Sequence, residues 1–186
     1  MILPIVGYGD PVLKKKAGDI DKSYPNLTEL IENMWETMYN ANGVGLAAPQ
    51  IGKPIRLFII DASPFEDEVE ELKDFKKVFI NAQILDETGD EWLFNEGCLS
   101  FPDLREDVMR KPKIRLRYQD ENFETHEEEF DGIAGRIIQH EYDHIDGIVF
   151  VDRISPLKRR LIKNKLTNIV KGAVNPSYKM KFAQRK

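Results

Sequence analysis

The chain has 186 residues, of which 41% are hydrophobic and 32% are charged, and its formal net charge at pH 7 is −5. This composition excludes a disordered chain, which would hold fewer apolar residues, and a membrane-spanning protein, which would carry longer apolar runs. The length fits one domain, residues 1–186, with a sizeable core. Because the sequence shows no secretory signal and has a single cysteine, we expect a cytoplasmic protein without an internal disulfide.

Charge is distributed unevenly along the chain. Residues 61–76 hold seven acidic residues against two lysines, whereas the stretch from Arg153 to the end holds eleven lysines and arginines and no acid. We therefore expect an acidic surface loop at 61–77, and a basic C-terminal helix and tail from about residue 153. The basic segment favours a polyanionic partner, with a solvated surface helix as the alternative.

The first predicted element is an amphipathic helix over residues 26–43, where apolar side chains recur at helical spacing. Asn26 and Glu29 resemble a capping box, and Asn42-Gly43 is a stop signal. The "GVGLAAPQIG" stretch that follows is glycine-rich, which permits close backbone approach. On its own this stretch favours a turn that leads into a packed strand.

Four segments have the composition and alternation of strands. Residues 55–61 and 78–85 flank the acidic loop, and residues 114–120 and 123–130 form a predicted hairpin through "DEN".

Two further helices are predicted towards the C-terminus. One covers residues 133–147 and is closed by Gly147, and the other covers 155–172, with Ser155 as its cap and Gly172 at its end. Because the strands precede the key helix and do not alternate with helices, we expect an α+β fold: antiparallel or mixed sheets around a central helix, with an N-terminal and a C-terminal helix.

The sequence "IIQHEYDHIDG" suggests a metal site on the helix of residues 133–147. His140 and His144 are four residues apart, so both imidazoles can point to one place on the same helix face. Glu141 lies one step round the helix, where it can act as a general base. This is the division of roles in the H-E-x-x-H pattern.

The third metal ligand has to be sought upstream. Phe150 stands where a metzincin would have its third histidine, and no acidic residue follows Asp152. Cys98, in "NEGCLSFP", can supply a thiolate. Together with the two histidines it would leave a fourth position open, as catalytic sites do.

Three motifs in order, "GVGLAAPQ", "EGCLS" and "QHEYDHIDG", resemble the signature motifs of the peptide deformylase family. The likeness extends from "DPVLKKKA" to "SPLKRR". Ile145 in place of the commoner leucine, the long acidic loop and the unfamiliar tail 172–186 depart from the pattern. The resemblance implies a hydrolase that removes the formyl group from the N-terminal formylmethionine of nascent polypeptides and releases formate.

The resemblance also implies a role for each motif residue. Cys98, His140 and His144 would bind one divalent metal, Fe²⁺ in the cell, with Zn²⁺, Ni²⁺ or Co²⁺ as possible replacements. Glu141 would be the general base. The Gln50 side chain and the Leu99 backbone N–H would stabilise the oxyanion, so the resemblance implies three catalytic residues: Glu141, Gln50 and Leu99.

Substrate contacts are expected from residues within or close to the three motifs. Gly43, Val44 and Gly45 would approach the formyl-Met peptide, which the resemblance implies would bind as an added strand. Ile133 and Ile137 are candidates for the methionine pocket, with ordinary core packing as the alternative. Arg105 matches a family arginine near the substrate, and a solvated arginine is the alternative. His126 is expected to be a surface residue.

Two other functions are considered. One is a metallopeptidase that cuts internal bonds, and the other is a ribosome- or RNA-binding module with a structural metal. The basic C-terminal helix could also dock a deformylase on ribosomal RNA. We expect no membrane partner and no DNA partner.

Overall fold

The structure is a computed structural model that describes residues 1–184. The strands are β1 (Ile5–Val6), β2 (Gly45–Ala47), β3 (Leu57–Asp61), β4 (Lys76–Thr88), β5 (Trp92–Cys98), β6 (Phe101–Arg110), β7 (Lys113–Gln119), β8 (Thr125–Phe130) and β9 (Met180–Lys181). The α-helices are α1 (Leu27–Asn40), α2 (Gly132–Ile145), α3 (Pro156–Leu161) and α4 (Lys163–Lys171).

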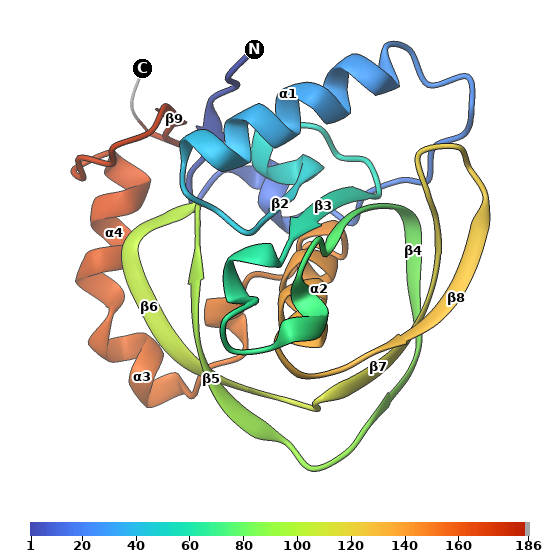
Figure 1. The fold of residues 1–186 in the computed structure, drawn as a ribbon. Helices are drawn as coiled ribbons and strands as arrows, with labels where there is room; N and C mark the ends of the chain where they lie inside the picture. Colours follow the sequence, from blue (N-terminus) through green and yellow to red (C-terminus); the bar gives the residue numbers. More distant parts are fainter. Residues whose placement is uncertain (185–186) are drawn as a thin grey trace.

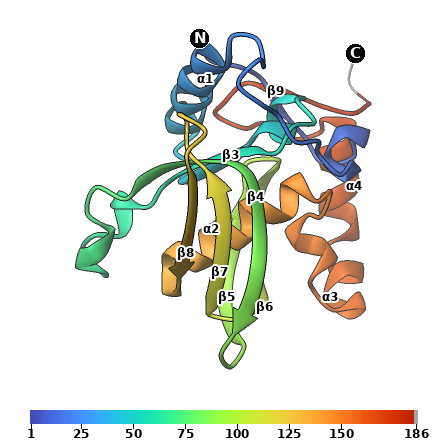
Figure 2. The ribbon, with the colours of Figure 1, turned by 90° about the vertical axis from the view of Figure 1, so that its right-hand side faces the viewer.

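The sheets surround helix α2. Strands β2-β3-β4-β7-β8 form one antiparallel sheet in that order, β5 and β6 form an antiparallel pair, and β1 pairs with β9 in parallel. Figure 1 shows α2 in the centre, with β4, β7 and β8 on one side and β5 and β6 on the other. Figure 2 shows the curved sheet passing across α2, with α3 and α4 beyond the end of that helix. The predicted α+β architecture with a central helix is confirmed.

Helix α2 is buried to an unusual degree for a polar sequence. Eleven of its fourteen residues are buried, and they include charged side chains. Ile138 and Ile145 pack into the core with Phe58 and Phe79, which stack at 4.8 Å between ring centroids. Because buried polar groups need partners, the polar face of α2 has to be satisfied from neighbouring strands.

The predicted helices form, with two differences. The predicted capping box does not form, because Asn26 adopts the left-handed conformation (φ 55°) and its side chain makes no cap hydrogen bond. The predicted single helix 155–172 is divided into α3 and α4 at Ile162. Ser155 does cap α3 by accepting from the Lys158 N–H, and Gly172 ends α4 at φ 69°.

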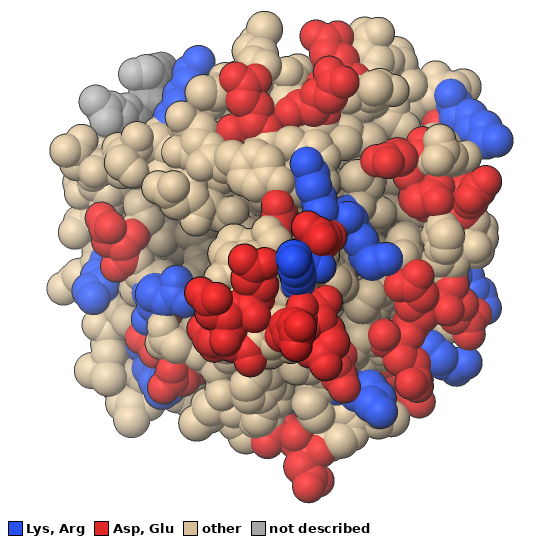
Figure 3. Space-filling model, viewed as in Figure 1, with Lys and Arg blue, Asp and Glu red and all other residues tan. Residues whose placement is uncertain are grey.

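The predicted strands form with shifted ends, and the predicted hairpin joins β7 to β8. The β5–β6 hairpin is an addition that the sequence patterns did not indicate. Between β3 and β4 the acidic segment 61–77 contains two short 3-10 helices, η3 (Ser63–Phe65) and η4 (Glu70–Leu72). Figure 3 shows acidic side chains gathered over this segment. Among residues 1–184, no helix has both the length and the apolar character needed to span a membrane.

Candidate active site

Three donor side chains converge between α2 and the end of β5. His140 and His144 lie on one face of α2, and Cys98 is the last residue of β5. Their ligand atoms all lie within 4.8 Å of one another, and the Cys98 Sγ is 3.3 Å from the His144 Nε2. Both histidines are buried. The structure therefore brings together the three residues that the sequence analysis named as ligands.

The donor set fits a divalent transition metal. A thiolate and two imidazole nitrogens are borderline-soft donors, and three protein ligands leave a fourth position open. The His140 Nδ1 is 2.9 Å from the Glu96 Oε1, so its other nitrogen remains available to a cation. Within residues 1–184, no further His, Cys, Asp or Glu side chain joins this cluster.

A buried ion network holds His140 in place. Glu96 accepts from the Arg110 Nε at 2.8 Å and from the Arg136 Nη1 at 2.9 Å, and Arg110 also donates to Asp143 at 2.7 Å. Burial disfavours the Glu96 carboxylate, but hydrogen bonds and charges from His140 and Arg110 outweigh it and hold its pKa well below the usual range. The carboxylate is therefore charged and fixes the orientation of the imidazole.

Glu141 is buried beside the cluster with one free oxygen. Its Oε2 has no hydrogen-bond partner among the described residues. Burial above all raises its pKa to about 7. Gly45 makes this position possible, because a Cβ on Gly45 would lie 2.5 Å from the Glu141 Oε1. A carboxylate with an unsatisfied oxygen in a pocket wall is suited to proton transfer.

Two hydrogen-bond donors neighbour Cys98, one in space and one in the sequence. Gln50, in the 3-10 helix η2 (Ala48–Ile51), accepts from the Ala47 N–H at 2.9 Å. Its Nε2 is thereby directed to the Cys98 Sγ at 3.5 Å and the Ser100 Oγ at 3.2 Å. Leu99 follows Cys98, and its backbone N–H makes no hydrogen bond to a described residue.

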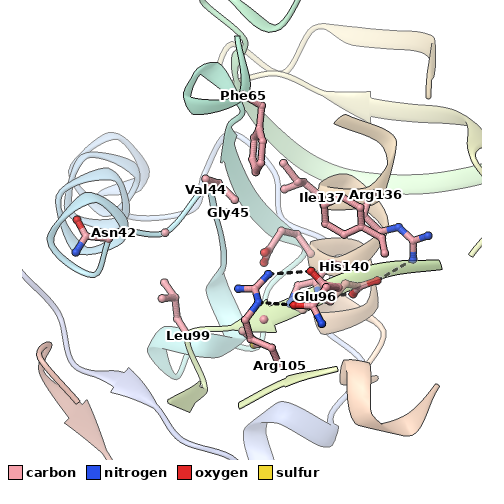
Figure 4. Close-up of a pocket in the computed structure, with 16 residues that line it drawn as sticks. Asn42, Val44, Gly45, Phe65, Glu96, Leu99, Arg105, Arg136, Ile137 and His140 are labelled. Atoms are coloured by element: carbon pink, nitrogen blue, oxygen red, sulfur yellow. Dashed lines mark hydrogen bonds and ion pairs between the residues drawn. The ribbon is translucent and has the colours of Figure 1, made fainter. Parts of the chain in front are cut away.

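The cluster opens into a cavity of about 260 Å³. In Figure 4, Phe65 and Ile137 lie at one end of this pocket and Leu99 and Arg105 at the other. The predicted substrate residues that line it are Gly43, Val44, Gly45, Arg105 and Ile137. Ile133 does not line it and packs, half-buried, against the core.

The structure also places residues to which the sequence patterns gave no role in the site. Phe65, Phe94 and Arg136 line the pocket, and their only sequence signal was position next to a motif or within the acidic loop. Phe150, which occupies the position of a metzincin ligand, is buried with its ring 5.9 Å from that of His140. His126 lies on β8, half-buried, with its Nε2 2.7 Å from the Asp120 Oδ2.

A cluster of one half-buried cysteine and two buried histidines, a neighbouring buried carboxylate and an open pocket together define the site of a metal-dependent hydrolase. A family model described as polypeptide deformylase matches residues 2–160. The chain is 62% identical to the peptide deformylase of Christiangramia forsetii, over 100% of this chain and 98% of that one. It is 58% identical to the peptide deformylase of Flavobacterium psychrophilum, over 100% of both chains.

Solved structures agree with this match. The peptide deformylase of Legionella pneumophila superposes with a TM-score of 0.81 at 37% identity, over 95% of this chain and 100% of that chain. The enzyme from Thermotoga maritima superposes with a TM-score of 0.75 at 40% identity, over 84% and 99%.

The chain belongs to the polypeptide deformylase family. Its activity is the hydrolytic removal of the formyl group from an N-terminal formylmethionine, and the family is metal-dependent. The metallopeptidase and RNA-binding alternatives are not favoured.

Proposed function

We propose that Cys98, His140 and His144 hold one divalent cation in this deformylase, Fe²⁺ in the cell, with Zn²⁺, Ni²⁺ or Co²⁺ able to replace it. The convergence of the three donors within 4.8 Å carries this proposal. A cation held there supplies Lewis acidity, which lowers the pKa of a coordinated water and polarises a carbonyl oxygen. The mixed sulfur and nitrogen donors suit all four ions.

Glu141 is the general base in this proposal. With a pKa of about 7 it can accept a proton from water near neutral pH and later donate it to the departing amine. The water oxygen bonds to the formyl carbon, the carbon–nitrogen bond breaks, and the products are formate and a free α-amino group. The free Oε2 of Glu141 supports this role.

Gln50 and Leu99 stabilise the oxyanion that forms on the formyl oxygen. The Gln50 Nε2 and the Leu99 N–H flank Cys98, so both can donate to one atom at the cluster. Deleting one such donor typically lowers the rate by about 10²–10³-fold.

The remaining pocket residues bind the substrate. Val44, Phe65 and Ile137 give the cavity apolar walls suited to a methionine side chain. The small residues Gly43 and Gly45 let the peptide backbone approach. Arg105 donates to the Asn95 Oδ1 and backbone oxygen at 2.8 Å each, which holds its guanidinium at the rim near the peptide path.

The basic C-terminal helices are proposed as a contact with ribosomal RNA. On α3 the side chains of Leu157 and Leu161 are 67% and 76% exposed, and Arg160 and Lys163 are exposed beside them. Lys and Arg side chains on one surface attract phosphate. Of the eleven basic residues of this segment, two (185 and 186) lie outside the described residues.

The expected cytoplasmic location of the protein stays a prediction.

The ribosome contact is tested by co-sedimentation. Arg160→Glu with Lys163→Glu should abolish ribosome binding at moderate salt and leave formate release from a short peptide unchanged. If the double variant sediments with ribosomes as the wild type does, this part of the proposal is wrong.

The site assignment is tested with Glu141→Ala. This variant should retain one equivalent of metal and lose at least about 10²-fold in formate release from a formyl-Met peptide. Glu106→Ala, on strand β6, is the matched control and should keep wild-type activity. Full activity of Glu141→Ala would remove the assigned base.

A further inference from the structure

The C-terminal tail returns to the active-site turn. It lies beyond residue 160, where the match to the family model ends. Strand β9 pairs in parallel with β1 next to the N-terminal segment, as Figure 1 shows. The Ile5 N–H donates to the Lys179 oxygen and the Gly7 N–H to the Lys181 oxygen, both at 2.9 Å. Phe182 is buried. The tail is thus fixed to the body of the protein immediately before and after Met180.

Tyr178 carries the contact between this tail and the active site. Its ring packs, half-buried, against the core cluster that includes Leu46 and Met38. Its hydroxyl donates a hydrogen bond of 2.8 Å to the backbone oxygen of Leu99. The hydrogen bond joins residues that are 79 positions apart in the sequence.

The turn that receives this hydrogen bond is held from several sides. Cys98 and Phe101 are paired across the β5–β6 hairpin, so Leu99 and Ser100 form its two-residue turn. The Ser100 oxygen accepts from the Tyr8 N–H at 2.9 Å. The Leu99 side chain packs against Gly43, where a Cβ would lie 2.8 Å from the Leu99 Cδ1. Tyr178 holds the remaining carbonyl of the turn.

We propose that Tyr178 is a positioning residue for the oxyanion donor. By binding the Leu99 oxygen it limits rotation about the Leu99 backbone and keeps the Leu99 N–H directed at the formyl oxygen. The inference rests on the proposed function, in which Leu99 N–H is that donor. Donors act in catalysis only where their direction is fixed before reaction, and displacements of about 1 Å cost up to about 10²-fold in rate.

A purely structural role for Tyr178 predicts a different result. If the hydroxyl served only folding, its loss would lower stability and leave kcat unchanged. If it orients the Leu99 N–H, its loss should lower kcat and leave KM nearly unchanged, because the donor acts on charge that develops after substrate binds.

The experiment compares Tyr178→Phe with Tyr24→Phe in the metal-loaded full chain. Tyr24 packs, half-buried, against the same core cluster, and its hydroxyl makes no hydrogen bond to a described residue. The readouts are kcat and KM for formate release, metal per chain, the melting temperature, and the Leu99 amide resonance in the zinc-loaded protein.

Tyr178→Phe should lower kcat about tenfold relative to Tyr24→Phe, less than the loss of a whole donor. KM should stay within about twofold of the Tyr24→Phe value, metal content should be unchanged, and the Leu99 amide resonance should shift. A kcat within twofold of the control, or a loss of activity that follows loss of metal, overturns the proposal. Glu141→Ala distinguishes failure of the proposed function from failure of the role of Tyr178. If Glu141→Ala is inactive while Tyr178→Phe is fully active, only the role of Tyr178 is wrong.

Discussion

Glu96 and Glu127 each form ion pairs with two arginines, but in opposite surroundings. Glu96 lies inside the protein, between β5, β6 and α2, and its partners Arg110 and Arg136 are buried as well. Glu127 lies on β8, and its pairs with Arg115 and Arg117 on β7 are 3.1 and 3.3 Å long on a solvated sheet face.

The two clusters differ in how far their charges are exposed to solvent, and this determines how strongly each charge depends on its partners. The side chains of Glu96, Arg110 and Arg136 are only 3%, 3% and 1% exposed. Water does not solvate these charges, so each needs its ion-pair partners to offset the cost of burial. The side chain of Glu127 is 41% exposed, and water screens its pairs. The interior cluster also contacts His140, one of the proposed metal ligands, whereas the outer cluster lies on the exposed face of the sheet.

The largest effect is expected for Glu96→Gln. Removing the charge leaves the buried Arg136 without a carboxylate partner and leaves Arg110 with Asp143 alone. Breaking a buried pair typically costs about 3–5 kcal/mol of unfolding free energy. His140 also loses its charged partner, so zinc affinity should fall about 10–100-fold. Urea unfolding and a zinc competition assay measure the two effects. Wild-type stability with wild-type zinc affinity would show that the interior network is dispensable.

A second effect is expected where α2 meets β2. Gly45→Ala places a Cβ within 2.5 Å of the Glu141 Oε1, so the carboxylate has to move away. We expect kcat/KM for formate release to fall about 10²-fold while metal binding persists. Gly18→Ala is the matched control, because a Cβ there meets no atom within 4 Å. Equal activity of the two alanine variants would contradict the close contact between Gly45 and Glu141.

The smallest effect is expected for Glu127→Gln, the same chemical change at the outer cluster. Its unfolding free energy should change by less than about 0.5 kcal/mol, and formate release should match the wild type. The comparison with Glu96→Gln in the same urea series isolates burial as the cause. A loss at Glu127 as large as that at Glu96 would break the comparison.

Sequence patterns predicted the parts of the site that are local. The four-residue spacing of His140 and His144 places them on a common face of any helix. The motifs around Cys98 and Gln50 predicted the third metal ligand and the side-chain oxyanion donor. The strands β7 and β8 were predicted from alternation and a turn, since one face of this hairpin is solvated.

The parts that the sequence did not predict depend on contacts between distant segments. Glu96, Arg110 and Arg136 resemble surface charges in the sequence, because their partners come from three separate elements. In the β5–β6 hairpin, two buried positions carry such charges, Glu96 and Arg110, which interrupts the alternation of apolar and polar residues. Tyr178 could not be linked to Leu99, which lies 79 residues away.

The central claim is that Cys98, His140 and His144 form the metal site, and titration of metal-free protein with Co²⁺ tests it most directly. The wild type should bind one equivalent tightly, with a thiolate-to-cobalt absorption band. Cys98→Ala should lose the band and most of the affinity. His126→Ala, from the separate Asp120–Glu124–His126 group, should keep both. Tight binding by Cys98→Ala, or loss of the band in His126→Ala, would contradict the account.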